Sequence, residues 1–157
     1  MVHAGLGSSA LNRYFASINV PPLSIKGTKK REREIGPTIE KLAKSSCRDG
    51  IDTEIQAIGD GVETGLETTE LTASFDMGWN CKGSGRAYNS KSGQAVMIGK
   101  NSGKILNYAT RKSNCKQCEV NKDIKHDCRM NWGGSSKAME GDCAVELIKE
   151  TKSDLTG

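Results

Sequence analysis

The chain has 157 residues, of which 35% are hydrophobic and only 4% aromatic, so it can build one modest domain around a small core. Its formal net charge is +4, and no segment approaches the roughly 18 apolar residues of a membrane span. The N-terminus lacks the apolar stretch of a signal peptide, so the six cysteines are expected in a reducing compartment.

Charge is grouped in blocks along the chain. Residues 1–48 carry nine Lys/Arg against three acidic residues, and residues 49–76 carry eight acidic residues and no Lys/Arg. Residues 77–137 carry twelve Lys/Arg against three acidic residues, and residues 138–157 two against five. Two basic blocks favour a polyanionic partner, because phosphate contacts release counterions. Charge alone is explained equally well by two solvated surfaces.

The first basic block has the pattern of two helices. Apolar residues at spacings of three and four predict a helix over residues 5–20, which Pro21-Pro22 would end. A second helix is predicted over about 27–47, with Gly36-Pro37 as a candidate break and with an apolar stripe formed by Ile35, Ile39, Leu42 and Ala43. Basic residues 29–33 on this helix would suit a helix-turn-helix DNA reader, whereas an ordinary helical hairpin is the commoner alternative.

The acidic block and the second basic block differ in pattern. Residues 49–70 are rich in acid, Thr and Gly, which predicts a linker. Apolar residues then alternate over 71–79, which predicts a strand, and shorter strands at 94–98 and 104–109 form a predicted hairpin. A final helix is predicted from Ser135 or Ser136 to about Lys152, with an apolar face of Met139, Cys143, Leu147 and Ile148.

Between the third strand and the final helix lie four possible metal ligands. Cys115 and Cys118 form a Cys-x2-Cys pair, and His126 and Cys128 follow with one residue between them. A Cys-x2-Cys turn directs two thiolates to one point, and alternate residues of an extended segment face the same side. This predicts a structural zinc with four protein ligands and therefore no catalytic role. A Cys115–Cys118 disulfide and metal-free thiols remain alternatives.

The other three cysteines are assigned lesser roles. Cys81 and Cys143 are reserve zinc ligands, and Cys47 is a plain helix residue. One carboxylate, Asp76, lies near the end of the most apolar strand. It is either a turn or edge residue or a Mg²⁺ ligand for phosphoryl transfer, which requires several converging carboxylates. Glu140, Asp142 and Glu146 on the final helix are expected to be solvated charges.

Several motifs in order carry a family resemblance. They are Ser74-Phe-Asp-Met-Gly-Trp79, the Gly-rich segment 83–93, the Cys/His groups and Asn131-Trp-Gly-Gly-Ser-Ser-Lys-Ala-Met-Glu140. Together they resemble the Mutator-like transposase domain of the animal Kolobok type, most strongly over residues 71–150. The helical start, including Val20-Pro-Pro-Leu23, is similar to the N-terminal region of the family.

The resemblance implies an RNase H-like fold with an Asp/Asp/Glu triad that binds Mg²⁺ and acts on DNA. Asp76 matches the first acid, and the four Cys/His ligands match a metal-binding insertion, 115–128, after the third strand. The second acid of the family follows the helix, at or after a fourth strand, whereas this sequence stops at Gly157. The expectation is therefore an N-terminal portion without the later acids, because Glu140, Asp142 and Glu146 stand on the wrong element.

The expected fold class is α+β or α/β: a truncated RNase H-like fold of three antiparallel strands, zinc insertion and helix over 71–157, after a helical region at 1–48 and a linker at 49–70. The expected function is a fragment of a DDE-type DNA transposase that binds DNA and structural zinc but is catalytically incomplete. The alternatives are a non-enzymatic zinc adaptor and a nuclease that is active only with a complementing chain. An unstable sheet with an open edge is a further alternative.

The expected partners are DNA and, as a candidate, a second copy or a complementing transposase chain, with no membrane. The expected location is the nucleus of a eukaryotic cell. The predicted DNA-contact residues are all basic and come from both basic blocks: Lys29, Lys30, Arg31, Arg33, Arg86 and Lys91.

Overall fold

The computed structural model describes residues 7–59, 71–81, 89–120, 125–126 and 128–156. The chain divides into two compact units, Met1–Ser45 and Ser46–Gly157. The described elements are three strands, two long helices and two short helices, so the fold is α+β. None of the helices among the described residues combines the length and apolar character that crossing a bilayer requires.

The first unit begins with α1, Ser8–Ser17, which is shorter than the predicted helix over 5–20. Asn19 ends it in the left-handed region with φ 57°, and the Val20 amide returns to the Phe15 carbonyl at 2.9 Å. The side chain of Asn12 then holds the Leu23 backbone at both its amide and its carbonyl, at 2.9 and 3.0 Å. This pair of hydrogen bonds turns the chain from α1 into the next helix.

The next helix, α2, extends over Ile25–Gly59 and corrects two predictions. Gly36-Pro37 does not break it, since the chain is helical on both sides of Pro37. Proline inside a helix removes one backbone donor and costs about 3 kcal/mol. Residues 49–59, predicted as linker, are helical. Cys47, Ile51 and Glu54 recur at spacings of three and four and are buried, so tertiary contacts favour a helix there. Residues 60–70 lie outside the described residues.

The second unit contains a three-stranded antiparallel sheet in the order β1-β2-β3, with β1 at Ala73–Trp79, β2 at Ser92–Gly99 and β3 at Ile105–Lys112. Ala73 pairs with Gly99, and Trp79 pairs with Gly93. The predicted β2–β3 hairpin is confirmed, and its turn contains Gly103 at φ 65°, a conformation that glycine adopts without strain. A register shift near Met97 and Ile98 leaves Leu106 and Asn107 both buried.

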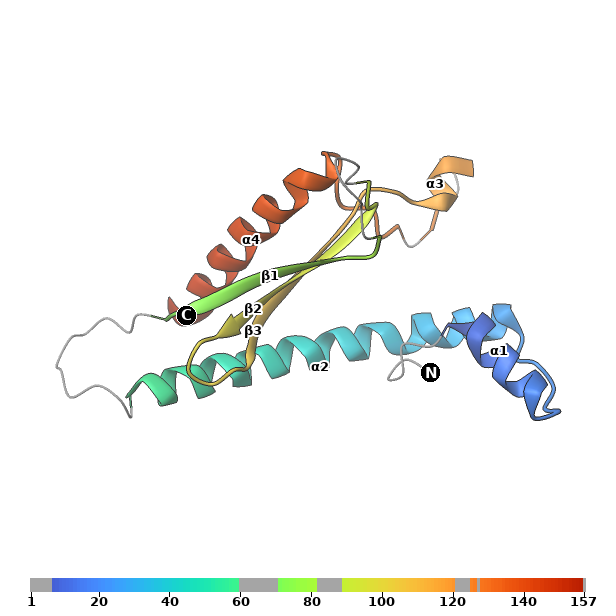
Figure 1. Ribbon diagram of the computed structural model, residues 1–157, viewed down its shortest axis with the longest axis horizontal. Coiled ribbons are helices and arrows are strands. Elements are labelled where there is room, and N and C mark those ends of the chain that lie inside the picture. Colours follow the sequence, from blue (N-terminus) through green and yellow to red (C-terminus); the bar gives the residue numbers. More distant parts are fainter. Residues whose placement is uncertain (1–6, 60–70, 82–88, 121–124, 127, 157) are drawn as a thin grey trace. The chain divides into compact units, whose positions relative to one another are not determined.

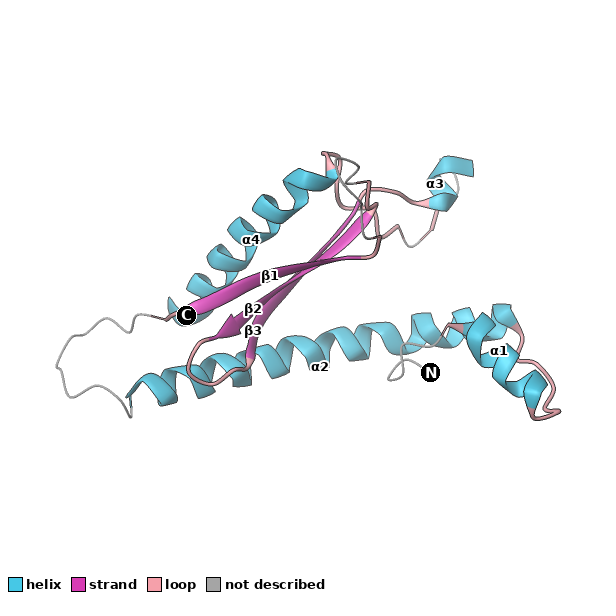
Figure 2. Cartoon of the chain, in the orientation of Figure 1, coloured by secondary structure: helices cyan, strands magenta, loops and turns pink. Residues whose placement is uncertain are grey.

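One face of this sheet is covered by α4, Ser136–Thr156 (Figure 2). The core is formed by side chains of alternating strand positions and of one row of α4, namely Met77, Ala95, Met97, Ala109, Met139, Cys143 and Leu147. The predicted α4 face is correct at three positions, but Ile148 is 59% exposed. The buried row follows i+4 spacing from Met139 to Thr151, which turns Ile148 towards the rim of the interface.

Residues 46–59 of α2 pack on the hairpin end of the sheet, on the opposite side from α4 (Figure 1). Gly50 lies so close to β3 that an added Cβ would stand 2.6 Å from the Ile105 carbonyl oxygen. Glu54 reaches the β2–β3 turn and accepts hydrogen bonds from Asn101 and Ser102. These contacts explain why the helix extends beyond residue 48.

Candidate functional site

The candidate site lies at the end of the sheet opposite the β2–β3 turn. We call this the loop end of the sheet; it is the place where β1 ends at Trp79, β2 begins at Ser92 and β3 ends at Lys112. The Cys/His segment leaves this end and contains α3, Lys116–Val120, which lies beyond the strands in Figure 1. The Ser136 hydroxyl at the start of α4 donates to the Ser90 carbonyl at 2.7 Å. Antiparallel pairing thus brings two connections, β1–β2 and β3–α4, to one place.

Four side chains of the Cys/His segment converge on one point. The ligand atoms of Cys115, Cys118, His126 and Cys128 all lie within 4.8 Å of one another. His126 Nε2 is 3.3 Å from both Cys115 Sγ and Cys118 Sγ, and Cys118 Sγ is 3.6 Å from Cys128 Sγ. The structure therefore brings together all four predicted metal ligands. The amide of Glu119 donates to the Cys115 carbonyl at 3.0 Å, which closes the turn between the first two ligands.

These distances suit a tetrahedral metal ion. Bond lengths of about 2.3 Å to sulfur and 2.0 Å to nitrogen give tetrahedron edges of about 3.8 Å between sulfurs and about 3.5 Å between sulfur and nitrogen. The spacings of 3.3 and 3.6 Å approach these values. All six cysteines are free thiols, so the Cys115–Cys118 disulfide alternative is not what the structure shows. The donor set can hold a metal ion such as zinc.

The thiols of this cluster differ in acidity. Hydrogen bonds to Cys115 from the Cys118 backbone amide above all, and also from Gln117 and His126, lower its pKa to about 6. The pKa of Cys118 is raised to about 11, first because its thiol shares a hydrogen bond with Cys128 and then because of burial. Adjacent thiolates repel one another, and a divalent cation would remove this repulsion as it binds.

The Cys/His segment is tied back to the sheet on both sides. The Ser113 amide donates to the Lys91 carbonyl at 2.8 Å, before the first ligand. After the last ligand, the Asn131 side chain accepts from the Lys112 amide at 2.8 Å and donates to the Thr110 carbonyl at 2.8 Å. Trp132 Nε1 donates to the Ser135 carbonyl at 3.0 Å. The ligands therefore stand on a loop with fixed ends.

Comparison with known families adds a finding to this geometry. The family model described as Mutator-like transposase matches residues 1–156. The chain belongs to the Mutator-like transposase family. The match includes α1 and α2, so it extends well beyond the motif-rich residues 71–150. Comparisons with curated proteins and with solved structures yield no match.

The remaining cysteines of this transposase chain are separate from the cluster. Cys143 is fully buried in the core under α4, and burial raises the pKa of its thiol. Its predicted role as a reserve ligand is wrong, because its sulfur packs among core side chains. Cys81 is exposed and belongs to no metal-binding group in the described part of the chain. Cys47 is buried on α2, in agreement with its predicted place on a helix.

Asp76 lies in the middle of β1, opposite Val96, and its side chain is exposed on the face turned away from α4. Among the described residues, the Cys/His cluster is the single group of three or more His, Cys, Asp or Glu side chains that could hold a metal ion. No such group includes Asp76. Its role as a Mg²⁺ ligand therefore stays a prediction.

Two acidic residues of α4, Asp142 and Glu146, have a different role from the predicted one. Arg111 is 7% exposed, and its Nε donates to Asp142 at 2.7 Å while its Nη2 contacts Glu146. Asp142 and Glu146 are therefore not simply solvated charges, because they bind a buried guanidinium. Glu140 is exposed, as predicted. Sequence reasoning missed Arg111, although its inward position on β3, two residues after Ala109, was a usable signal.

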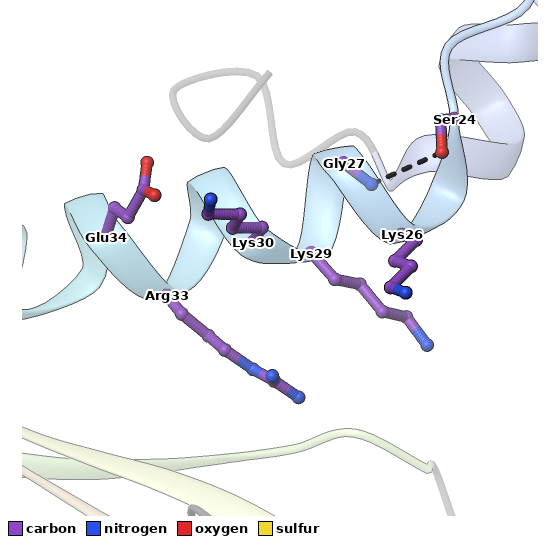
Figure 3. Close-up of a pocket in the computed structure, with 7 residues that line it drawn as sticks. All are labelled: Ser24, Lys26, Gly27, Lys29, Lys30, Arg33 and Glu34. Atoms are coloured by element: carbon purple, nitrogen blue, oxygen red, sulfur yellow. Dashed lines mark hydrogen bonds between the residues drawn. The ribbon is translucent and has the colours of Figure 1, made fainter.

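The predicted DNA-contact residues are placed on two elements. Lys29, Lys30, Arg31 and Arg33 are exposed on α2 in the first unit. Lys26, Lys29 and Arg33 point to one side of the helix, and Lys30 and Glu34 to another (Figure 3). Arg31 forms an ion pair with Glu34 at 2.8 Å. Lys91 is exposed at the loop end of the sheet, and Arg86 lies outside the described residues. Their contacts with DNA stay predictions.

Proposed function

We propose that this chain is the DNA-binding, zinc-braced part of a DDE-type transposase of the Kolobok group, and that it acts in the nucleus. The observation that carries the proposal is the convergence of Cys115, Cys118, His126 and Cys128 at the loop end of the sheet, in a chain whose residues 1–156 match the family. A transposase must hold DNA, and the two basic blocks provide the charge for this.

The proposed zinc is structural. Three thiolates and one imidazole complete a tetrahedron, which leaves no position for a water or substrate. The loop that carries them is bounded by hydrogen bonds at Ser113 and Asn131, and none of its ligands belongs to the hydrophobic core. The metal therefore replaces the core that this segment lacks and holds its backbone in one conformation.

An RNase H-like fold is supported by the topology. Three antiparallel strands in sequential order are followed by a helix that packs on one face of the sheet. In the described residues, β1 pairs only with β2, so its other edge is open. Beside it lies a shallow apolar groove formed by β1, β2 and the end of α4, which is lined by Leu71, Ala73, Met97, Ile148, Thr151, Lys152 and Leu155. A further strand on this edge would cover the groove and extend the sheet.

Asp76 is the proposed first carboxylate of the Mg²⁺ site. It is exposed on the central part of β1, where a metal ion would have access. Two-metal phosphoryl transfer needs several carboxylates, and the described residues bring no others into a group with Asp76. The chain alone is therefore expected not to cut DNA when Mg²⁺ is supplied, and cleavage by the purified chain would contradict this.

Zinc content and DNA binding test the proposal together. Purified protein should contain about one zinc per chain, and Cys118→Ser should lose most of it because three ligands bind far more weakly. Cys81→Ser, which changes an exposed cysteine outside the cluster, is the matched control and should keep its zinc. Less than half an equivalent in the wild-type protein would refute the zinc site.

The DNA arm uses a short labelled duplex and anisotropy measured at several salt concentrations. The affinity of the wild-type protein should fall steeply between about 50 and 200 mM salt, because each neutralised phosphate releases counterions. A zinc adaptor for proteins would keep its zinc and show no salt-sensitive DNA binding. The adaptor is the second candidate function, since a compact Cys/His loop with an exposed rim is also typical of protein-binding zinc modules.

A further inference from the structure

The loop end of the sheet carries an excess of positive charge. The described residues of the segments at this end, 80–81, 89–91, 112–120, 125–126 and 128–137, include six Lys/Arg against one acidic residue. Five exposed lysines there are described: Lys91, Lys112, Lys116, Lys125 and Lys137. The single described acidic residue in these segments is Glu119. Zinc with three thiolates and a neutral imidazole adds only one negative charge, so it offsets little of this excess.

The structure gathers these lysines from five separate places along the chain, three in helices or strands and two in loops. Lys112 ends β3, Lys116 begins α3, Lys125 precedes the ligand His126 and Lys137 stands in the first turn of α4. Lys91 joins them because its carbonyl accepts the Ser113 amide at 2.8 Å, and Ser136 is tied to Ser90 at 2.7 Å. The charge is therefore a property of the folded sheet end, although its members are distant in sequence.

Two other sets of basic residues in the second unit lie near carboxylates. Arg111 points into the core and is neutralised by Asp142 and Glu146. At the opposite end of the sheet, Lys100 and Lys104 flank a turn that binds the carboxylate of Glu54. A one-sided group of lysines is the electrostatic footprint expected of a surface that binds a polyanion.

We propose that the loop end of the sheet binds the phosphodiester backbone of duplex DNA, with the zinc loop as the support for Lys112, Lys116 and Lys125. This rests on the proposed DNA-binding function and adds a second contact surface to the basic helix α2. Asp76 lies three residues before Trp79, about 10 Å from the loop end at the rise of an extended strand. DNA held there would pass close to the proposed Mg²⁺ ligand.

The test compares three triple variants on the same labelled duplex. Lys112→Ala/Lys116→Ala/Lys125→Ala removes charge from the loop end. Lys100→Ala/Lys104→Ala/Lys149→Ala removes equal charge from exposed positions away from it, and Lys29→Ala/Lys30→Ala/Arg33→Ala removes it from α2. The loop-end variant should bind about tenfold more weakly or worse, and its slope of log affinity against log salt should be shallower by up to about 2.7. The Lys100 variant should match the wild-type slope.

Zinc content verifies that the loop-end variant is folded, because its ligands are unchanged and it should retain about one zinc per chain. If the loop-end variant keeps the wild-type affinity and slope while the α2 variant loses them, this surface is not a DNA contact, yet the proposed function stands. If the wild-type protein does not bind DNA at all, the proposed function fails as well. Equal affinity for polyglutamate of the same charge would overturn the assignment to DNA.

Discussion

Glu54 is a fully buried carboxylate that holds the turn between β2 and β3. Its oxygens accept hydrogen bonds from the Asn101 amide and side chain, both at 2.9 Å, and from the Ser102 amide at 2.7 Å. Burial raises the pKa of this carboxyl, but the hydrogen bonds from Ser102 and Asn101 outweigh it and lower the pKa from 4.5 to about 2. A methyl group on Gly99 would overlap Glu54 Oε2, so this contact also requires glycine there.

Replacing Glu54 by Gln should therefore destabilise the second unit by about 1.5–3 kcal/mol at neutral pH, because charged hydrogen bonds are lost. The folded pKa of about 2 lies below the ordinary 4.5, so this stability is complete above pH 4.5 and is lost as the pH falls towards 2. Urea unfolding of wild-type and variant protein at neutral and acidic pH measures the difference, which should shrink on acidification. Asp52→Asn, an exposed change on the same helix, is the control; a difference independent of pH would contradict this account.

At the scale of elements, Arg111 is the polar link between β3 and α4. The side chain of Arg111 is 8% exposed, whereas the side chains of Asp142 and Glu146 are 44% and 38% exposed. The hydrogen bond to Glu146 is the main cause that raises the pKa of Arg111, and it outweighs the lowering effect of burial. The helix thus contributes two partially hydrated carboxylates to one buried charge, and α4 is fixed in rotation on the sheet.

Removing one of the two carboxylates that bind Arg111 should lower the free energy of unfolding only slightly, and removing both should lower it much more. Asp142→Asn or Glu146→Gln alone should lower the free energy of unfolding by about 1 kcal/mol, because the other carboxylate still pairs with Arg111. The double variant leaves a buried, uncompensated guanidinium, and its cost should reach about 3 kcal/mol or more. Chemical denaturation of the four proteins completes a double-mutant cycle. Additive single costs would contradict the shared-partner account, and Glu140→Gln, an exposed change on α4, should be neutral.

At the scale of the whole molecule, the acidic residues do not form a catalytic group within the described part of the chain. Asp142 and Glu146 form ion pairs with Arg111, and Glu54 accepts hydrogen bonds from the β2–β3 turn. Asp76 is exposed on β1. Two-metal cleavage requires converging carboxylates, and the described residues bring no others to Asp76, so its role as a Mg²⁺ ligand stays a proposal.

The chain is loaded with zinc, repurified and then incubated with Mg²⁺ and supercoiled plasmid. We expect the plasmid to stay intact. Asp76→Asn is the control, since it should show the same background level as the wild-type chain. Nicking that depends on Mg²⁺ and disappears in Asp76→Asn would show that the chain completes a catalytic site by itself or as an oligomer. A size measurement by light scattering would then distinguish these two cases.

Local pattern was sufficient where neighbouring residues decide the outcome. The alternation of 71–79, the turn chemistry of 99–103 and the Cys/His spacing are short-range signals, and the strand, the hairpin and the ligand cluster agree with them. Tertiary structure decided what depends on distant partners. Residues 49–59 are helical because Gly50, Ile51 and Glu54 meet the hairpin, and Asp142 and Glu146 meet Arg111 from another element. Burial and pairing between segments supply the free energy there, and composition along the chain does not carry that information.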